Sequence, residues 1–162
     1  MTAVAPQSSA RVPAVGERAP EFSLKSTTGE TVPLSSFRGK KHVLLAFFPL
    51  AFTSTCTAEL CAMRDDWDDF AKHDVVVLPI SVDSTASLKE YKTKYEMKSE
   101  LLSDFRRDVS RAYGVLNEER FNAKRSYFLI DREGIVRWAH VEEHGGFRRE
   151  KAELLAEVAK LR

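Results

Sequence analysis

The 162-residue sequence has little of what marks several large classes of protein. Its two cysteines are too few for the disulfide framework of a small secreted domain. Its 25 Lys and Arg residues are balanced by 24 Asp and Glu residues, so it lacks the positive excess of a nucleic-acid binder. It has no apolar run near the roughly 20 residues that span a bilayer, and no secretory signal at its start. We therefore expect a cytoplasmic enzyme without nucleic-acid or membrane partners.

Hydrophobic residues make up 43% of the sequence and charged residues 30%, a balance typical of a folded domain rather than a disordered chain. Residues 1–12 are small and polar and show no periodicity, which predicts a flexible N-terminal tail. The remaining length suits one domain with a substantial core, and it contains no repeat or linker. We predict a single domain over residues 13–162.

Two nearly continuous apolar runs, residues 43–48 and 75–82, each have the length of a strand buried on both faces. Between them, Leu60, Met63, Trp67 and Phe70 recur at steps of three and four, which predicts one amphipathic helix over residues 55–71. Strand, helix and strand form a βαβ unit.

Other segments complete the expected fold. A hairpin over residues 21–34, with a turn at Thr28 and Gly29, is expected to act as a lid rather than as part of the core. Residues 127–130 and 135–139 flank a four-residue turn and should pair antiparallel. Further helices are expected over residues 87–95, with Ser87 and Glu90 as a capping box, and over residues 110–113 and 150–161. The order predicts an α/β domain: a mixed central sheet with helices on both faces and an N-terminal β-hairpin.

Cys56 lies in the connection between the first buried strand and its helix, where open α/β sheets form their sites. The hydroxyls of Thr53, Ser54 and Thr55 offer N-caps, so Cys56 is expected in the first helical turn. Free N–H groups and the helix dipole favour a thiolate there, and a thiolate is a nucleophile. The alternative is that Cys56 is only a small buried residue.

The residues around Cys56 favour the nucleophile. The Thr53 hydroxyl is placed to hydrogen-bond the sulfur and an incoming oxygen, and Pro49 removes an N–H group and shields the loop from water. Pro49, Thr53 and Cys56 together match the motif P-x-x-x-T-x-x-C, which resembles the active site of the peroxiredoxins. This resemblance covers roughly residues 15–141. It implies a thioredoxin-like fold and a thiol-dependent peroxidase without metal or organic cofactor.

The resemblance extends to other residues. Arg125, in the segment before residues 126–131, resembles the arginine that peroxiredoxins place beside the reactive sulfur, and Glu59 lies at the C-x-x-E position that orients it. The alternative for Arg125 is a surface charge like its neighbour Lys124. By resemblance, Cys56 reduces hydrogen peroxide or an organic hydroperoxide and becomes a sulfenic acid. A thioredoxin, a glutaredoxin-like protein or a low-molecular-weight thiol would then reduce the oxidised enzyme. A homodimer is expected.

The sequence around the two cysteines combines features of two peroxiredoxin subgroups. The run from Pro49 to Leu60 is similar to alkyl hydroperoxide reductase E, usually a one-cysteine enzyme, whereas the C-x-x-x-x-C spacing of Cys56 and Cys61 resembles the resolving cysteine of the bacterioferritin comigratory protein subgroup. On an ideal helix these Cα atoms lie about 8 to 9 Å apart, beyond the about 7 Å that a disulfide allows. Cys61 can therefore resolve Cys56 only if the first turns unwind. Otherwise it packs in the core beside Leu60.

Three further functions stay open on the residues alone. A dithiol–disulfide oxidoreductase of the same fold normally needs C-x-x-C, which is absent. A non-enzymatic redox sensor needs the same thiolate but reacts once, and an interaction module needs no reactive Cys56. A metal site has little support, because the four histidines show no ligand spacing to the cysteines.

Overall fold

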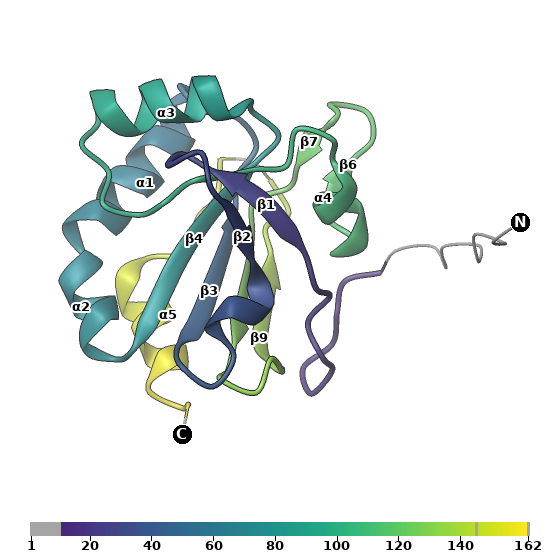
Figure 1. Cartoon of the computed structure of the whole chain (residues 1–162), viewed down its shortest axis with the longest axis vertical. Helices are drawn as coiled ribbons and strands as arrows, with labels where there is room; N and C mark the ends of the chain where they lie inside the picture. The colour runs from purple at the N-terminus through teal and green to yellow at the C-terminus, as the bar shows by residue number, and fades with distance from the viewer. Residues whose placement is uncertain (1–10, 145, 162) are drawn as a thin grey trace, which may run out of the picture.

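The computed structural model describes residues 11–144 and 146–161. They form an α/β fold around a mixed seven-stranded sheet with the order β2-β1-β5-β4-β3-β8-β9 (Figure 1). The strands of this sheet are β1 (Ser23–Ser26), β2 (Thr31–Pro33), β3 (His42–Phe47), β4 (Val75–Ser81), β5 (Leu102–Ser103), β8 (Ser126–Ile130) and β9 (Val136–Val141). A separate pair consists of β6 (Leu116–Asn117) and β7 (Asn122–Ala123). The helices are α1 (Ser54–Asp65), α2 (Trp67–Lys72), α3 (Thr85–Lys94), α4 (Asp108–Ala112) and α5 (Lys151–Val158), with a 3-10 helix at Leu34–Phe37.

Strand β3 lies at the centre and has both faces buried. It runs parallel to β4 and antiparallel to β8. Its side chains alternate between two apolar clusters: Leu44 and Ala46 belong to one, and Leu45 and Phe47 to the other. Because successive strand residues point to opposite faces, a continuous apolar run is the pattern of a strand covered on both sides.

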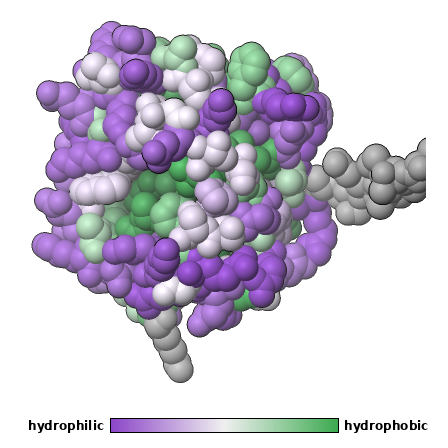
Figure 2. Space-filling model, in the orientation of Figure 1, coloured by the Kyte–Doolittle hydropathy of each residue, from purple (hydrophilic) through white to green (hydrophobic). Residues whose placement is uncertain are grey.

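Helices cover both faces of the sheet, as expected. The first cluster packs beneath α1, α2, α3 and α5 through buried side chains such as Leu60, Phe70, Leu88 and Leu154. The second lies on the opposite face beneath α4, and Leu24 of β1 and Leu34 of the 3-10 helix belong to it. Charged side chains cover most of the outside, and Figure 2 shows a hydrophilic face around a central hydrophobic area.

The prediction of one continuous helix over residues 55–71 is wrong. It is broken at Asp66, whose backbone (φ −94°, ψ 4°) ends α1 and begins α2. Four aspartates lie between residues 65 and 69. Aspartate is a poor helix former and is disfavoured at a helix C-terminus but favoured at an N-terminus, so this stretch suits an end and a new start.

Two other expectations need correction. The β1–β2 hairpin is no separate lid, because β1 pairs antiparallel with β5 and extends the central sheet, with Leu24 in its core. Helix α3 begins before Ser87: Ser84 is its N-cap and accepts a hydrogen bond from the Ser87 N–H. The N-cap of α3 therefore lies three residues before the predicted capping box of Ser87 and Glu90.

The antiparallel pair at the end of the sheet is confirmed. β8 and β9 pair through Ser126–Val141 to Ile130–Val136, with an irregularity near Ile130. The flexible tail predicted for residues 1–12 lies mostly outside the described residues. Of its described part, Arg11 forms an ion pair with Glu17 at 2.5 Å.

Candidate active site

The loop after β3 delivers Cys56 to the start of α1. Thr53 is the N-cap of α1 in extended conformation (φ −88°, ψ 154°), and Cys56 is the third residue of the helix, as expected. The Thr53 hydroxyl does not cap the helix, however. It donates a hydrogen bond to the backbone oxygen of Leu50 at 2.7 Å, which closes the loop on itself.

Cys56, Arg125 and Glu59 meet in the interior between α1 and the start of β8. Arg125 Nη2 donates to Cys56 Sγ at 3.0 Å, and Arg125 Nη1 donates to Glu59 Oε1 at 2.7 Å. All three residues are at most 2% exposed. Cys56 and Glu59 are three residues apart, so they share a face of α1 and can be reached by one guanidinium group. The alternative of a surface charge for Arg125 is therefore wrong.

The electrostatics of this cluster follow from burial. Burial raises the pKa of Glu59 above its ordinary value, although the charge of Arg125 opposes this effect. Burial also acts to lower the pKa of Arg125, but the charges of Glu59 and Cys56 and the hydrogen bonds to them raise it overall. Arg125 is thus held as a cation in contact with the sulfur, and a fixed cation favours a thiolate over a thiol.

Tyr127 is a member of this cluster that sequence reasoning missed. Its hydroxyl donates a short hydrogen bond to Glu59 Oε2 and accepts one from the Arg149 backbone N–H at 3.0 Å. Burial raises the pKa of Tyr127, so its hydroxyl keeps its proton. Residues 125 and 127 share a face of an extended chain, and this period of two was a usable signal for Tyr127.

A carboxylate from the next strand holds the loop that leads to Cys56. The Ala51 N–H donates to Asp83 Oδ2 at 2.9 Å, and the Ser81 hydroxyl donates to the same oxygen at 2.7 Å. Asp83 follows β4, which is parallel to β3, so both strands deliver their carboxyl ends to the same edge. No sequence signal distinguished Asp83 from other turn residues.

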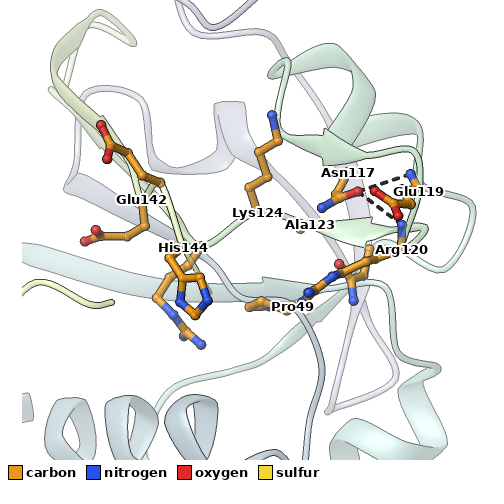
Figure 3. A pocket seen from close by; sticks show the side chains of 11 residues that line it. Pro49, Asn117, Glu119, Arg120, Ala123, Lys124, Glu142 and His144 are labelled. Carbon is orange, nitrogen blue, oxygen red and sulfur yellow. Dashed lines mark hydrogen bonds between the residues drawn. The ribbon is translucent and has the colours of Figure 1, made fainter. Parts of the chain in front are cut away.

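A polar hollow of about 260 Å³ lies beside Pro49 and Arg125. Figure 3 shows Asn117, Glu119 and Arg120 on one side of it, and Glu142 and His144 on the other. The Asn117 side chain accepts hydrogen bonds from the backbone N–H groups of Glu119 and Arg120, both at 3.1 Å, which orders the first side. The hollow therefore borders two of the predicted site residues, of which Arg125 is buried.

Cys61 is not part of the buried cluster. It is half-buried, and both cysteines are free thiols. Cys56 and Cys61 lie on the same uninterrupted helix, α1, so their five-residue spacing places them beyond disulfide reach while the helix is intact.

Within the described part of the chain, no three His, Cys, Asp or Glu side chains gather as metal ligands would. No helix among the described residues is long and apolar enough to cross a membrane.

Comparison with known proteins gives a consistent result. The model of the AhpC/TSA family matches residues 15–139. The chain is 43% identical to alkyl hydroperoxide reductase E of Mycobacterium tuberculosis, over 83% of this chain and 89% of the relative. It is 36% identical to peroxiredoxin Bcp of Bacillus subtilis, over 79% and 86% of the two chains. The reduced 2-Cys peroxiredoxin of Plasmodium vivax superposes with a TM-score of 0.83 at 33% identity, covering 91% of this chain and 81% of that one. The chain belongs to the AhpC/TSA family of peroxiredoxins.

Proposed function

We propose that Cys56 is the nucleophile of this thiol-dependent peroxidase. The observation that carries the proposal is the Arg125 Nη2 to Cys56 Sγ contact of 3.0 Å inside a buried cluster. Such a cation stabilises a thiolate at neutral pH, and it lies where negative charge develops as a peroxide bond breaks. A redox sensor or a dithiol oxidoreductase of the same fold is not favoured by the family membership.

The reaction proceeds by displacement at oxygen. The Cys56 thiolate attacks one peroxide oxygen, an S–O bond forms, and the O–O bond breaks. The leaving oxygen departs with the electron pair and takes a proton, giving water from hydrogen peroxide or an alcohol from an organic hydroperoxide. The sulfur is oxidised to a sulfenic acid and the peroxide is reduced.

Other residues act through Arg125 and the loop. Glu59 and Tyr127 hold the guanidinium group in place, because the Glu59 carboxylate accepts from both side chains. The Thr53 hydroxyl donates its hydrogen bond to the Leu50 oxygen. The Thr53 oxygen keeps a lone pair that can accept a hydrogen bond from the peroxide O–H. Pro49 has no N–H group and borders the polar hollow beside Arg125.

Cys61 is proposed as the resolving residue. Its thiolate attacks the sulfur of the Cys56 sulfenic acid, an S–S bond forms, the S–O bond breaks, and the oxygen leaves as water after taking a proton. Because α1 keeps the two Cα atoms apart, this step needs the first turns of α1 to unwind. A thioredoxin, a glutaredoxin-like protein or a small thiol then reduces the disulfide.

Mass spectrometry after one equivalent of hydrogen peroxide tests these roles. Wild-type protein should form a Cys56–Cys61 disulfide, and Cys61→Ser should stop at a Cys56 sulfenic acid that over-oxidises readily. Cys56→Ser should consume peroxide at less than about a tenth of the wild-type rate, because removing a nucleophile costs orders of magnitude. Higher residual turnover would reject Cys56. A Cys61 that stays alkylatable after complete oxidation of Cys56 would reject resolution by Cys61.

The remaining proposals concern partners. Coupled assays with hydrogen peroxide, an alkyl hydroperoxide, and each of the three reductant classes would rank them by turnover. The proposed homodimer is tested by size-exclusion chromatography with light scattering, for which a mass of one chain, 18.3 kDa, would contradict it.

A further inference from the structure

Tyr91 of α3 contacts both halves of the segment that carries Cys56. Helix α3 lies beside α1 (Figure 1), and the hydroxyl oxygens of Tyr91 and Thr57 are 2.9 Å apart. The Tyr91 ring lies 4.7 Å from the Phe52 ring in the preceding loop. Tyr91 is fully buried. One side chain thus ties the loop and the first turn of α1 to a neighbouring helix.

The Thr57 contact is placed where α1 must open. Thr57 follows Cys56 directly and lies between the two cysteines. Its N–H donates to the Thr53 backbone oxygen at 2.9 Å, the hydrogen bond that begins the helix. Burial raises the pKa of Tyr91 to about 12, so the Tyr91 hydroxyl keeps its proton near neutral pH and can serve as a donor. Unwinding the first turn has to break the hydroxyl pair of Tyr91 and Thr57.

We infer that the hydroxyl pair of Tyr91 and Thr57 sets how often the start of α1 opens, and thereby how much oxidised Cys56 is captured by Cys61. The inference rests on the proposed resolving role of Cys61. Tyr91 is a positioning residue: it makes no hydrogen bond to Cys56 among the described contacts and acts through Thr57. When the pair is intact, the sulfenic acid stays exposed longer to a second peroxide molecule, which oxidises it to sulfinic acid. When the pair is broken, disulfide formation is favoured.

The test compares variants that remove one hydroxyl and keep the shape of the side chain. Tyr91→Phe keeps the ring contacts, and Thr57→Val keeps the branched side chain. Each should speed disulfide formation about fivefold, the effect of one ordinary hydrogen bond. The double variant should show no more than either single variant, because the two substitutions remove the same contact. The measured quantity is the ratio of disulfide to sulfinic acid after a peroxide pulse, read by mass spectrometry.

Two conservative variants serve as matched controls. Thr57→Ser keeps the hydroxyl and should restore the wild-type ratio. Tyr95→Phe removes a neighbouring hydroxyl from α3's C-terminal end that makes no hydrogen bond among the described residues, and it should leave the ratio unchanged. Thermal unfolding of every variant separates a general loss of stability from this local effect. Where the wild type forms the disulfide, equal ratios in the wild type, Tyr91→Phe and Thr57→Val would overturn the inference, as would additive effects in the double variant.

Amide hydrogen exchange in the reduced protein separates this inference from the proposed function. Tyr91→Phe and Thr57→Val should speed exchange over residues 54–61 about fivefold and leave residues 67–72 unchanged. If neither the wild type nor any variant forms the disulfide, the proposed resolving role of Cys61 is wrong. Faster exchange in both variants would then still support control of opening by the pair, whereas unchanged exchange would refute it.

Discussion

The guanidinium group of Arg125 joins Cys56 to Glu59 in one line of buried charge. Its Nη2 atom contacts the sulfur at 3.0 Å and its Nη1 atom contacts the Glu59 carboxylate at 2.7 Å. The two contacts depend on one another, because the Glu59 carboxylate that fixes the guanidinium group also offsets part of the positive charge that the sulfur experiences. The strength of Glu59 as a hydrogen-bond acceptor therefore influences the reactivity of Cys56.

Arg125→Met should slow the reaction with peroxide by about a hundredfold, as for loss of one charge-stabilising donor. Stopped-flow kinetics measure this rate. The substitution leaves Glu59 buried without its cation, which is destabilising. Arg125→Met with Glu59→Gln removes both charges and keeps the test valid if the single variant unfolds. An unchanged rate would remove Arg125 from the site.

Tyr127→Phe should lower the free energy of unfolding by about 1 to 3 kcal/mol, because a buried Glu59 oxygen loses its partner. It should also slow peroxide reduction several-fold by loosening Arg125. Tyr113→Phe is the matched control: its hydroxyl donates to the Pro20 oxygen at 2.7 Å, and its ring packs in the cluster on the opposite face of the sheet. Tyr113→Phe should reduce stability without changing the rate. Equal rates for both variants would show that Tyr127 is only structural.

Thr53→Val should slow the reaction with peroxide about tenfold, the cost of a lost hydrogen bond to a reacting group. The loop closure to the Leu50 oxygen is lost as well, so Thr53→Ser, which keeps the hydroxyl, is the control. Stopped-flow oxidation rates of the two variants should differ clearly. If both react at the same rate, the Thr53 hydroxyl has no part in the reaction.

His42 should make the protein less stable in mild acid. Its side chain is buried at the start of β3, and Nδ1 has no hydrogen-bond partner among the described residues. Burial and the charge of Arg132 lower the pKa of His42, against the opposing charges of Asp131, Asp74 and Glu133. Because the folded protein disfavours the protonated form, the contribution of His42 is complete above the unfolded pKa of about 6.5 and is lost as pH falls below it.

Urea unfolding at pH 7.5 and pH 5.5 measures this effect. The wild type should lose at most about 1.4 kcal/mol per pH unit through this one proton. His42→Leu, which removes the titrating group, should lose less over the same range. Parallel pH profiles for the two proteins would contradict the assignment.

Much of the fold could be predicted because β3 and β4 are buried on both faces and therefore read as continuous apolar runs. The start of α1 was predicted to within a residue, because residues 53–55 offered N-cap hydroxyls and the helix begins at Ser54 after the N-cap Thr53. The break at Asp66 was missed because the spacing of Met63, Trp67 and Phe70 continues across it, and apolar spacing does not register a change in the backbone. Strand β5 has two residues, too few to show an alternation.

Part of the site could likewise be predicted from the sequence, and part could not. The motif of Pro49, Thr53 and Cys56 is local, and the structure places Arg125 and Glu59 around the sulfur as the family resemblance implied. The contacts of Asp83 with Ala51 and of Tyr91 with Thr57 join segments more than 30 residues apart through ordinary side chains. Such pairs have no periodic or motif signal, and only the tertiary arrangement reveals them.

The interruption at Asp66 separates α1 from α2, and α2 has anchors of its own. Phe70 is buried, and Lys151 of α5 contacts Asp66 at 3.3 Å and Asp69 at 2.7 Å. In one continuous helix, unwinding near Cys56 would pull on these residues as well. With the helix interrupted, opening of its first turns uncovers Leu60 but keeps Phe70 in the core. Repeated cycles of oxidation and recovery would therefore expose less of the apolar surface that leads damaged proteins to aggregate.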